Sequence, residues 1–287
     1  MRSSQATVPS HGIGPFLHSS LPLSFWSSLV STTFTLKVEF EMEGSSKCLF
    51  LMIRAPIEVT GPAKPSLSKW SLGIMDGGIG ALGRALQQQP FPELRQLTVC
   101  NCRLIGEKGM AELARSIGTG NLNNLEVLKF QSNHFIGDTG AKVLADALQS
   151  GKLASLRRID LLDNGIGDEG LSAIALALGS GNVPKLTSLR VGSEAEAFHM
   201  KGGQALARMI QSENLPFLED LRFRGCVVEE GVIAVIKALE TRTVGALKKL
   251  DLRYCGIGLE GAILLARALS LPCFSSLRLL DLGDSVL

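Results

Sequence analysis

The chain has 287 residues with 29 basic and 27 acidic side chains, and its formal net charge of +2 argues against a surface built as a whole for nucleic acid or anionic lipid. Its length predicts either two compact domains or one elongated body. Hydrophobic residues make up 45% and charged residues 20%, which suits a full core and excludes a disordered chain.

The first segment, residues 1–33, is rich in serine, with nine serines between Ser3 and Ser31, and it contains no acidic residue. Its apolar stretch is interrupted by Ser and Pro, which argues against a secretory signal. A transit peptide is the weaker alternative, because Arg2 is the only arginine before Arg54. We therefore interpret residues 1–33 as a flexible tail.

Residues 34–66 contain two apolar runs. The first, FTLKVEFEMEG, alternates apolar and polar residues, and the second, CLFLMI, follows after a short Gly- and Ser-containing turn. Such a pattern predicts a β-hairpin. We expect the hairpin to serve as an N-terminal cap for the structure that follows it.

From residue 67 to residue 287 the chain is built from a repeated unit with spacings of 29 to 32 residues. Each unit opens with L-x-x-L-x-L-x-x-N/C, whose positions we call places one to nine. Apolar residues at places four and six alternate with polar residues, which predicts a short strand with those two places turned inward. A Gly then precedes apolar residues at four-residue intervals, which predicts a helix of about ten residues. We count about seven repeats plus a truncated eighth strand. The first of these repeats is degenerate, and its strand should lie near Leu67. The first leucines of the clear repeats are Leu94, Leu125, Leu156, Leu186, Leu218, Leu247 and Leu277.

Several positions within the repeat carry further expectations. An Asn or Cys at place nine should bond the backbone of its own turn and of a neighbouring turn. Gly120, Gly151 and Gly179 should end helices in the left-handed conformation. Glu194 departs from the pattern, so we expect a bulged loop there. Leu280 and Leu282 should be under-covered, either because the chain is a fragment or because a second surface covers them.

These residues resemble a leucine-rich repeat protein of the ribonuclease-inhibitor-like subclass, whose long repeats pair a strand with a full helix. The resemblance covers residues 67–287. It implies an α/β solenoid, curved, with parallel strands on the concave face and helices on the convex face.

The sequence offers no catalytic motif, so we predict no enzyme, no cofactor and no metal site. The cysteines show no zinc-ligand spacing, and those at place nine are expected to be buried structural thiols in a reducing, cytoplasmic setting. Cys100 is the exception, because strand alternation turns it outward and leaves a reactive thiol as a minor alternative. His134 and His199 are expected at the surface.

The outward-facing residues predict a binding surface. At place five, Arg190 should pair with Asp160 and Arg222 with Asp251, which neutralises that column. At place seven, neighbouring arginines lack an acid in their own column, so an anionic ligand would explain them, although relief by nearby Glu219 and Asp220 is equally compatible. The residues proposed to bind a partner are Arg224, Arg253, Tyr254, Lys249, Arg222 and Arg190.

The resulting functional prediction is a non-enzymatic protein–protein interaction scaffold or adaptor that binds a protein partner, acidic or phosphorylated, on the concave face. Neither nucleic acid nor membrane is expected as a partner. The alternative is a GTPase-activating protein, since the Ran GTPase-activating protein has similar long repeats, although this chain lacks the acidic C-terminal tail typical of that family. A ribonuclease inhibitor is disfavoured, because those proteins are acidic and cysteine-rich.

Overall fold

A computed structural model describes residues 35–43, 46–54, 76–92, 94–100, 106–133, 136–193, 198–241 and 247–285. The expected tail at residues 1–33, the weak strand near Leu67, the loop at Glu194 and the side chain of His134 lie outside the described residues. The strands are β1 (Thr35–Glu43), β2 (Ser46–Arg54), β3 (Leu94–Cys100), β4 (Val127–Lys129), β5 (Arg158–Asp160), β6 (Ser188–Gly192), β7 (Asp220–Arg224), β8 (Lys249–Asp251) and β9 (Leu279–Asp281). The α-helices are α2 (Asp76–Gln88), α3 (Glu107–Ile117), α4 (Gly137–Gln149), α5 (Asp168–Gly179), α6 (Met200–Gln211), α7 (Glu229–Glu240) and α8 (Gly258–Ala268).

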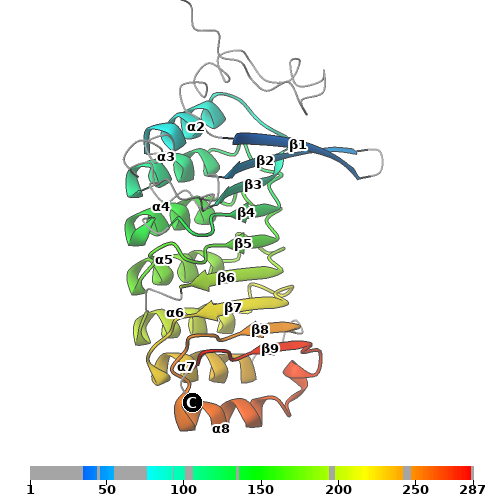
Figure 1. Ribbon diagram of the computed structural model, residues 1–287. Helices are drawn as coiled ribbons and strands as arrows, with labels where there is room; N and C mark the ends of the chain where they lie inside the picture. Colours follow the sequence, from blue (N-terminus) through cyan, green and yellow to red (C-terminus); the bar gives the residue numbers. More distant parts are fainter. Residues whose placement is uncertain are drawn as a thin grey trace, which may run out of the picture.

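The described strands form one sheet in chain order, from β1 to β9. β1 and β2 pair antiparallel, and every later neighbour pairs parallel. Figure 1 shows the helices stacked along one face of this sheet, with each strand and its following helix forming one coil. The predicted α/β solenoid is therefore confirmed. The strand that pairs with β3 is β2, so the sheet continues from the repeats into the segment 34–66.

The core lies between the sheet and the helices and runs through the repeat coils from α2 onward. Leucines at places one and four, such as Leu125 and Leu128, are fully buried. The helices approach one another closely at glycines. A Cβ on Gly203 of α6 would lie 2.5 Å from the Cα of Gly231 of α7, so a side chain there would push the coils apart.

Place nine ties neighbouring coils together, as the sequence predicts. The amide nitrogen of Asn133 donates to the carbonyl of Phe130 in its own coil (2.7 Å) and to that of Val99 in the preceding coil (2.9 Å). The thiol of Cys255 likewise donates to the carbonyl of Phe223 in the preceding coil (3.3 Å). The hydrogen bonds of Asn133 and Cys255 offset the free-energy cost of burying these polar groups.

The helix N-termini are capped across coils, which the sequence analysis did not predict. In α5 and α6 the N-cap residue makes no side-chain cap bond. Instead, Asp138 of α4 accepts hydrogen bonds from the backbone N–H groups of Gly167 and Gly170 at the start of α5, both at 2.8 Å. Asp168 of α5 does the same for Gly202 of α6, also at 2.8 Å. A carboxylate at the positive end of the next helix is favourable for both hydrogen bonding and the helix dipole.

Helix C-termini agree with the predicted glycines in two of three places. Gly120 and Gly151 have φ values of +94° and +72°. After α5, however, Gly179 is still helical, and Gly181 takes the left-handed conformation with φ +86°. The expectation for Gly179 is therefore wrong, because the helix extends to that residue before the chain turns.

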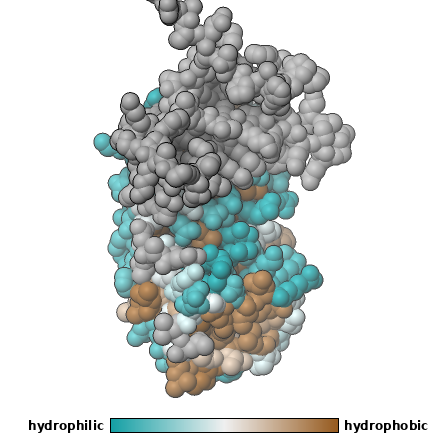
Figure 2. Space-filling view, in the orientation of Figure 1, coloured by the Kyte–Doolittle hydropathy of each residue, from teal (hydrophilic) through white to brown (hydrophobic). Residues whose placement is uncertain are grey.

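The coil of α8 and β9 is less covered than the others. Leu250 and Leu252 are fully buried, whereas Leu280 and Leu282, at the same places of the last strand, are only partly buried. Figure 2 shows apolar surface gathered at this end of the molecule, and the side chains of Leu259 and Ile263 on α8 are exposed. The predicted under-coverage is confirmed. None of the described helices is long and apolar enough to cross a membrane.

Candidate partner-binding surface

The parallel register places the predicted residues on one face of the sheet. Lys129 pairs with Asp160, which pairs with Arg190, which pairs with Arg222. We call this face, which carries places three, five and seven and is not covered by the helices, the concave face. All six proposed binding residues come from its strands or from the turns that follow them.

The first half of the concave face is a chain of alternating charges. The guanidinium of Arg190 lies between two carboxylates, 3.5 Å from Asp160 and 3.2 Å from Asp220. Lys129 contacts Asp160 from the other side at 3.9 Å. Arg222 pairs with Asp220 at 3.3 Å. The Arg190–Asp160 pair is confirmed. Arg222 lies opposite Asp251 in the register, as predicted, but the acid that contacts it directly is Asp220, two residues earlier on the same strand face.

Asp251 is the acidic partner of both place-seven arginines, which the sequence left without an acid in their own column. Its carboxylate accepts two hydrogen bonds from Arg224, at 2.7 and 2.9 Å, and two from Arg253, at 3.1 and 3.2 Å. Arg253 also contacts Asp281 at 3.2 Å. These arginines therefore have acidic partners, and no ligand is needed to explain their proximity.

Burial sets the energetics of this cluster. The side chains of Arg224 and Asp251 are only 9% and 2% exposed. Burial raises the pKa of Asp251, and the neighbouring Arg224 opposes that rise. Ionising Asp251 in this place therefore depends on its arginine partners. The cluster holds the strands β7, β8 and β9 together more than it offers free charge to a partner.

Free positive charge lies at the rim where the strands begin. Arg158 and Lys249, both at place three, are exposed, and so is Arg278, the residue just before β9. Among the described residues, none of the three has an acidic atom within 4.0 Å, whereas nearby Lys248 pairs with Glu219 at 2.7 Å. We call Arg158, Lys249 and Arg278 the cationic rim. Of the six predicted binding residues, only Lys249 belongs to it.

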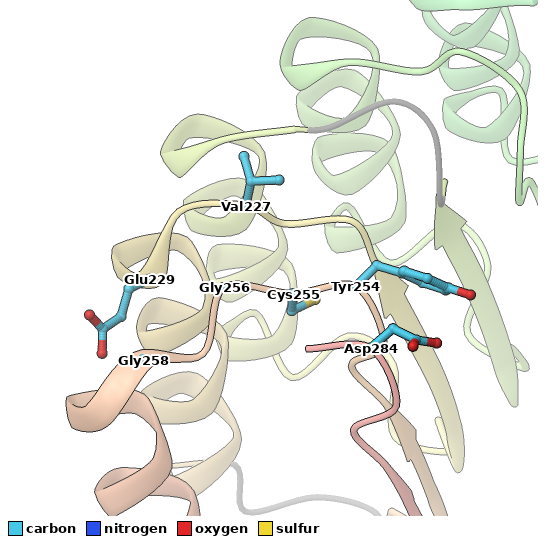
Figure 3. A pocket seen from close by; sticks show the side chains of 7 residues that line it. All are labelled: Val227, Glu229, Tyr254, Cys255, Gly256, Gly258 and Asp284. Atoms are coloured by element: carbon cyan, nitrogen blue, oxygen red, sulfur yellow. The ribbon is translucent and has the colours of Figure 1, made fainter. Parts of the chain in front are cut away.

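The opposite edge of the face, where the strands end, carries a shallow pocket (Figure 3). It has a volume of about 260 Å³, and its lining consists of Val227, Glu229, Tyr254, Cys255, Gly256, Gly258 and Asp284. In Figure 3 the ring of Tyr254 and the carboxylate of Asp284 extend to the same side, away from the helices, and Glu229 lies at the other end beside α7. Among the residues that line the pocket, two are acidic and none is basic.

The cysteines and histidines offer no reactive centre in the described part of the chain. Burial raises the pKa of Cys226 to about 12 and that of Cys255 to about 11. Cys100, which the sequence left open as a reactive thiol, is buried in the sheet. No group of three His, Cys, Asp or Glu side chains able to hold a metal ion occurs among the described residues. His199 is exposed, as predicted, with its Nδ1 3.6 Å from Asp168.

The sequence analysis missed three features of this surface. It placed Arg224 and Asp251 in separate columns, although a diagonal across neighbouring strands brings long side chains together. It named Lys249 at place three but not the exposed Arg158, which occupies the same place of an earlier coil. It also missed the pocket, because Gly256 and Val227 carry no chemical signal of their own in the sequence.

Comparisons with known proteins agree with the repeats. A family model described as a leucine-rich repeat matches residues 121–145, 152–175 and 247–266. The chain is 29% identical over 253 residues to the Tonsoku-like protein of Mus musculus, covering 77% of this chain and 18% of that protein. The chain thus spans less than a fifth of the length of this relative. Together the solenoid, its repeats and these matches show a leucine-rich repeat protein.

Proposed function

We propose that this protein is a non-enzymatic scaffold that binds a protein partner on its concave face. The seven repeat strands β3–β9, spaced about 4.8 Å apart, make a face roughly 30 Å long. That length suits a standard interface of about 800 Å² per partner. Strand-plus-helix repeats of this length also support membership of the ribonuclease-inhibitor-like subclass.

The observation that carries the proposal is the uneven charge on this face. Its centre is neutralised by internal pairs such as Arg190–Asp160 and Arg224–Asp251. The cationic rim retains exposed charge without an acidic neighbour in the described structure. An acidic or phosphorylated segment of the partner is the chemistry that complements it. The ion-paired residues in the centre of the face then form a rigid surface against which the partner packs.

The test is affinity capture from extracts of the native cell with the full chain. We expect Arg158→Glu combined with Lys249→Glu to lose a specific protein that the unaltered chain retains. The matched control is Lys108→Glu combined with Lys152→Glu, which changes the same charge at exposed positions outside the strands and should retain that protein. Capture that is equal in both variants would contradict the proposal.

Two further arms define the chemistry of the partner. Treating the extract with phosphatase should abolish capture if the partner is phosphorylated and leave it intact if the partner is acidic. Raising the salt concentration should weaken capture in either case, because the contact is electrostatic. The alternative of GTPase activation is tested separately, since a scaffold leaves the rate of GTP hydrolysis by small GTPases unchanged.

A further inference from the structure

A strained tyrosine borders the pocket at the strand ends. Tyr254 occupies place eight, where the repeat backbone turns with a left-handed conformation, and its φ is +59°. The residues with positive φ at the same place of other coils are Ser132, Asp163, Gly225 and Asp284. Those are small or turn-forming side chains, which tolerate this conformation. A bulky aromatic residue does not tolerate it well, and such outliers gather at functional sites.

The ring of Tyr254 does not serve the core. It is half-buried, it lines the pocket, and in Figure 3 it points away from the helices. The pocket beside it is small, and its lining is mainly apolar. Its volume of about 260 Å³ lies below the roughly 300–1,000 Å³ of small-molecule sites, so it fits a single large side chain. Val227, which is 53% exposed, forms part of the apolar wall.

The charges around the pocket determine which residues can flank the bound side chain. Glu229 and Asp284 lie at its two ends, and its lining contains no basic residue. Glu229 accepts the N–H of Gly261 at 3.1 Å, which holds its carboxylate at the start of α8, so Asp284 is the carboxylate that lies beside the tyrosine ring. A segment with basic residues beside its apolar side chain would match these carboxylates and could also stack a cation on the tyrosine ring.

We propose that the pocket bounded by Val227, Tyr254 and Asp284 binds one apolar side chain of a protein partner that is flanked by basic residues. This inference rests on the proposed scaffold function and adds a second contact at the edge opposite the cationic rim. A partner segment crossing the face would place an acidic group on the rim and a basic, apolar group at the pocket. Tyr254 is then retained, despite its strained backbone, because its ring forms the pocket wall.

The test uses synthetic capped tripeptides and the full chain, with backbone amide NMR shifts as the readout. Arg-Leu-Arg should shift the amides of Val227, Gly256 and Gly258 in a saturable way. Glu-Leu-Glu and Arg-Gly-Arg should each bind at least about fivefold more weakly, a loss expected for a single well-placed contact. Equal binding of Arg-Gly-Arg would show attraction by charge alone and would overturn the proposal.

A variant separates the role of the ring from that of the backbone. Tyr254→Asn keeps a residue that tolerates the left-handed conformation but removes the ring. We expect it to melt at the same temperature as the unaltered chain or higher, and to bind Arg-Leu-Arg at least about fivefold more weakly. Unchanged binding by this stable variant would overturn the proposal.

Affinity capture with these variants distinguishes the pocket proposal from the scaffold proposal. If the variant Arg158→Glu with Lys249→Glu loses the partner while Tyr254→Asn retains it at full strength, the pocket proposal fails and the scaffold function stands. If every variant retains the partner equally, the concave-face proposal itself fails.

Discussion

At the scale of single residues, Asp251 is the most consequential charged group of the concave face, because two arginines depend on it. Asp251→Ala would remove the carboxylate that accepts two hydrogen bonds from the buried Arg224, and we expect a loss of about 3–5 kcal/mol in the free energy of unfolding. Asp281→Ala is the matched control, since Asp281 contacts the same Arg253 but is 37% exposed. It should cost at most about 1 kcal/mol. Similar losses in urea unfolding of both variants would contradict this assignment.

The buried thiols give a pH-dependent prediction. Cys226 and Cys255 have pKa values of about 12 and 11 in the fold, against an ordinary thiol value of 9.0. Above pH 9 the unfolded chain therefore loses protons that the folded chain keeps, so stability should fall as the pH rises from about 9 to 12. At pH 8, alkylation by iodoacetamide should modify these two thiols only after unfolding. Rapid modification of either one in the native protein would be incompatible with the structure.

The sequence alone predicted which residues share the concave face, because strand alternation fixes the outward places once the repeat is aligned. It could not predict the pairing of Arg224 and Arg253 with Asp251. That pairing depends on the diagonal reach of arginine across strands and on burial, which column-by-column reading ignores. The strain at Tyr254 also depends on a backbone angle that only the turn geometry shows.

At the scale of elements, capping between coils links each helix to the one before it. Asp138→Ala would free two N–H groups at the start of α5, and we expect it to cost about 1–2 kcal/mol. Asp146→Ala, at an exposed position in the last turn of α4, should change stability by less than about 0.5 kcal/mol. Chemical denaturation of the two variants measures the difference, and an equal effect would show that the cap contributes nothing.

A core leucine tests the strand assignment. Leu161 follows β5 at place six and is buried, so Leu161→Ala should lower the free energy of unfolding by about 2–5 kcal/mol. Leu176→Ala is the control, because Leu176 is 70% exposed on α5. We expect that change to fall within about 0.5 kcal/mol of zero. A costly Leu176→Ala with a harmless Leu161→Ala would reverse the assigned faces.

At this scale the repeat predicted the strands and helices of the clear coils, because the leucine and glycine places carry the packing. It did not predict that β2 would lie directly against β3, since the degenerate first repeat has no leucine signature near Leu67. The capping acids were also missed: Asp138 and Asp168 look like ordinary first-turn residues of their own helices, and their partners lie about thirty residues further along the chain.

At the scale of the whole molecule, the sheet extends without a break into the N-terminal strands. Deleting residues 1–60 would remove β1 and β2 and leave the edge of β3 unpaired, which favours aggregation. We expect a lower melting temperature or aggregation, whereas deleting residues 1–33 leaves both strands intact and should change little. An unchanged melting curve for the longer deletion would show that these strands do not cap the solenoid.

We expect a protein partner to be bound by the concave face rather than by the helices. Site-specific photocrosslinking addresses it directly, with a benzoylphenylalanine in place of Lys249 on the rim or of Lys142 on α4, in cells that express the full chain. A discrete crosslinked protein is expected from position 249 and none from position 142. The same protein crosslinked from position 142 alone, or equally from both positions, would contradict it.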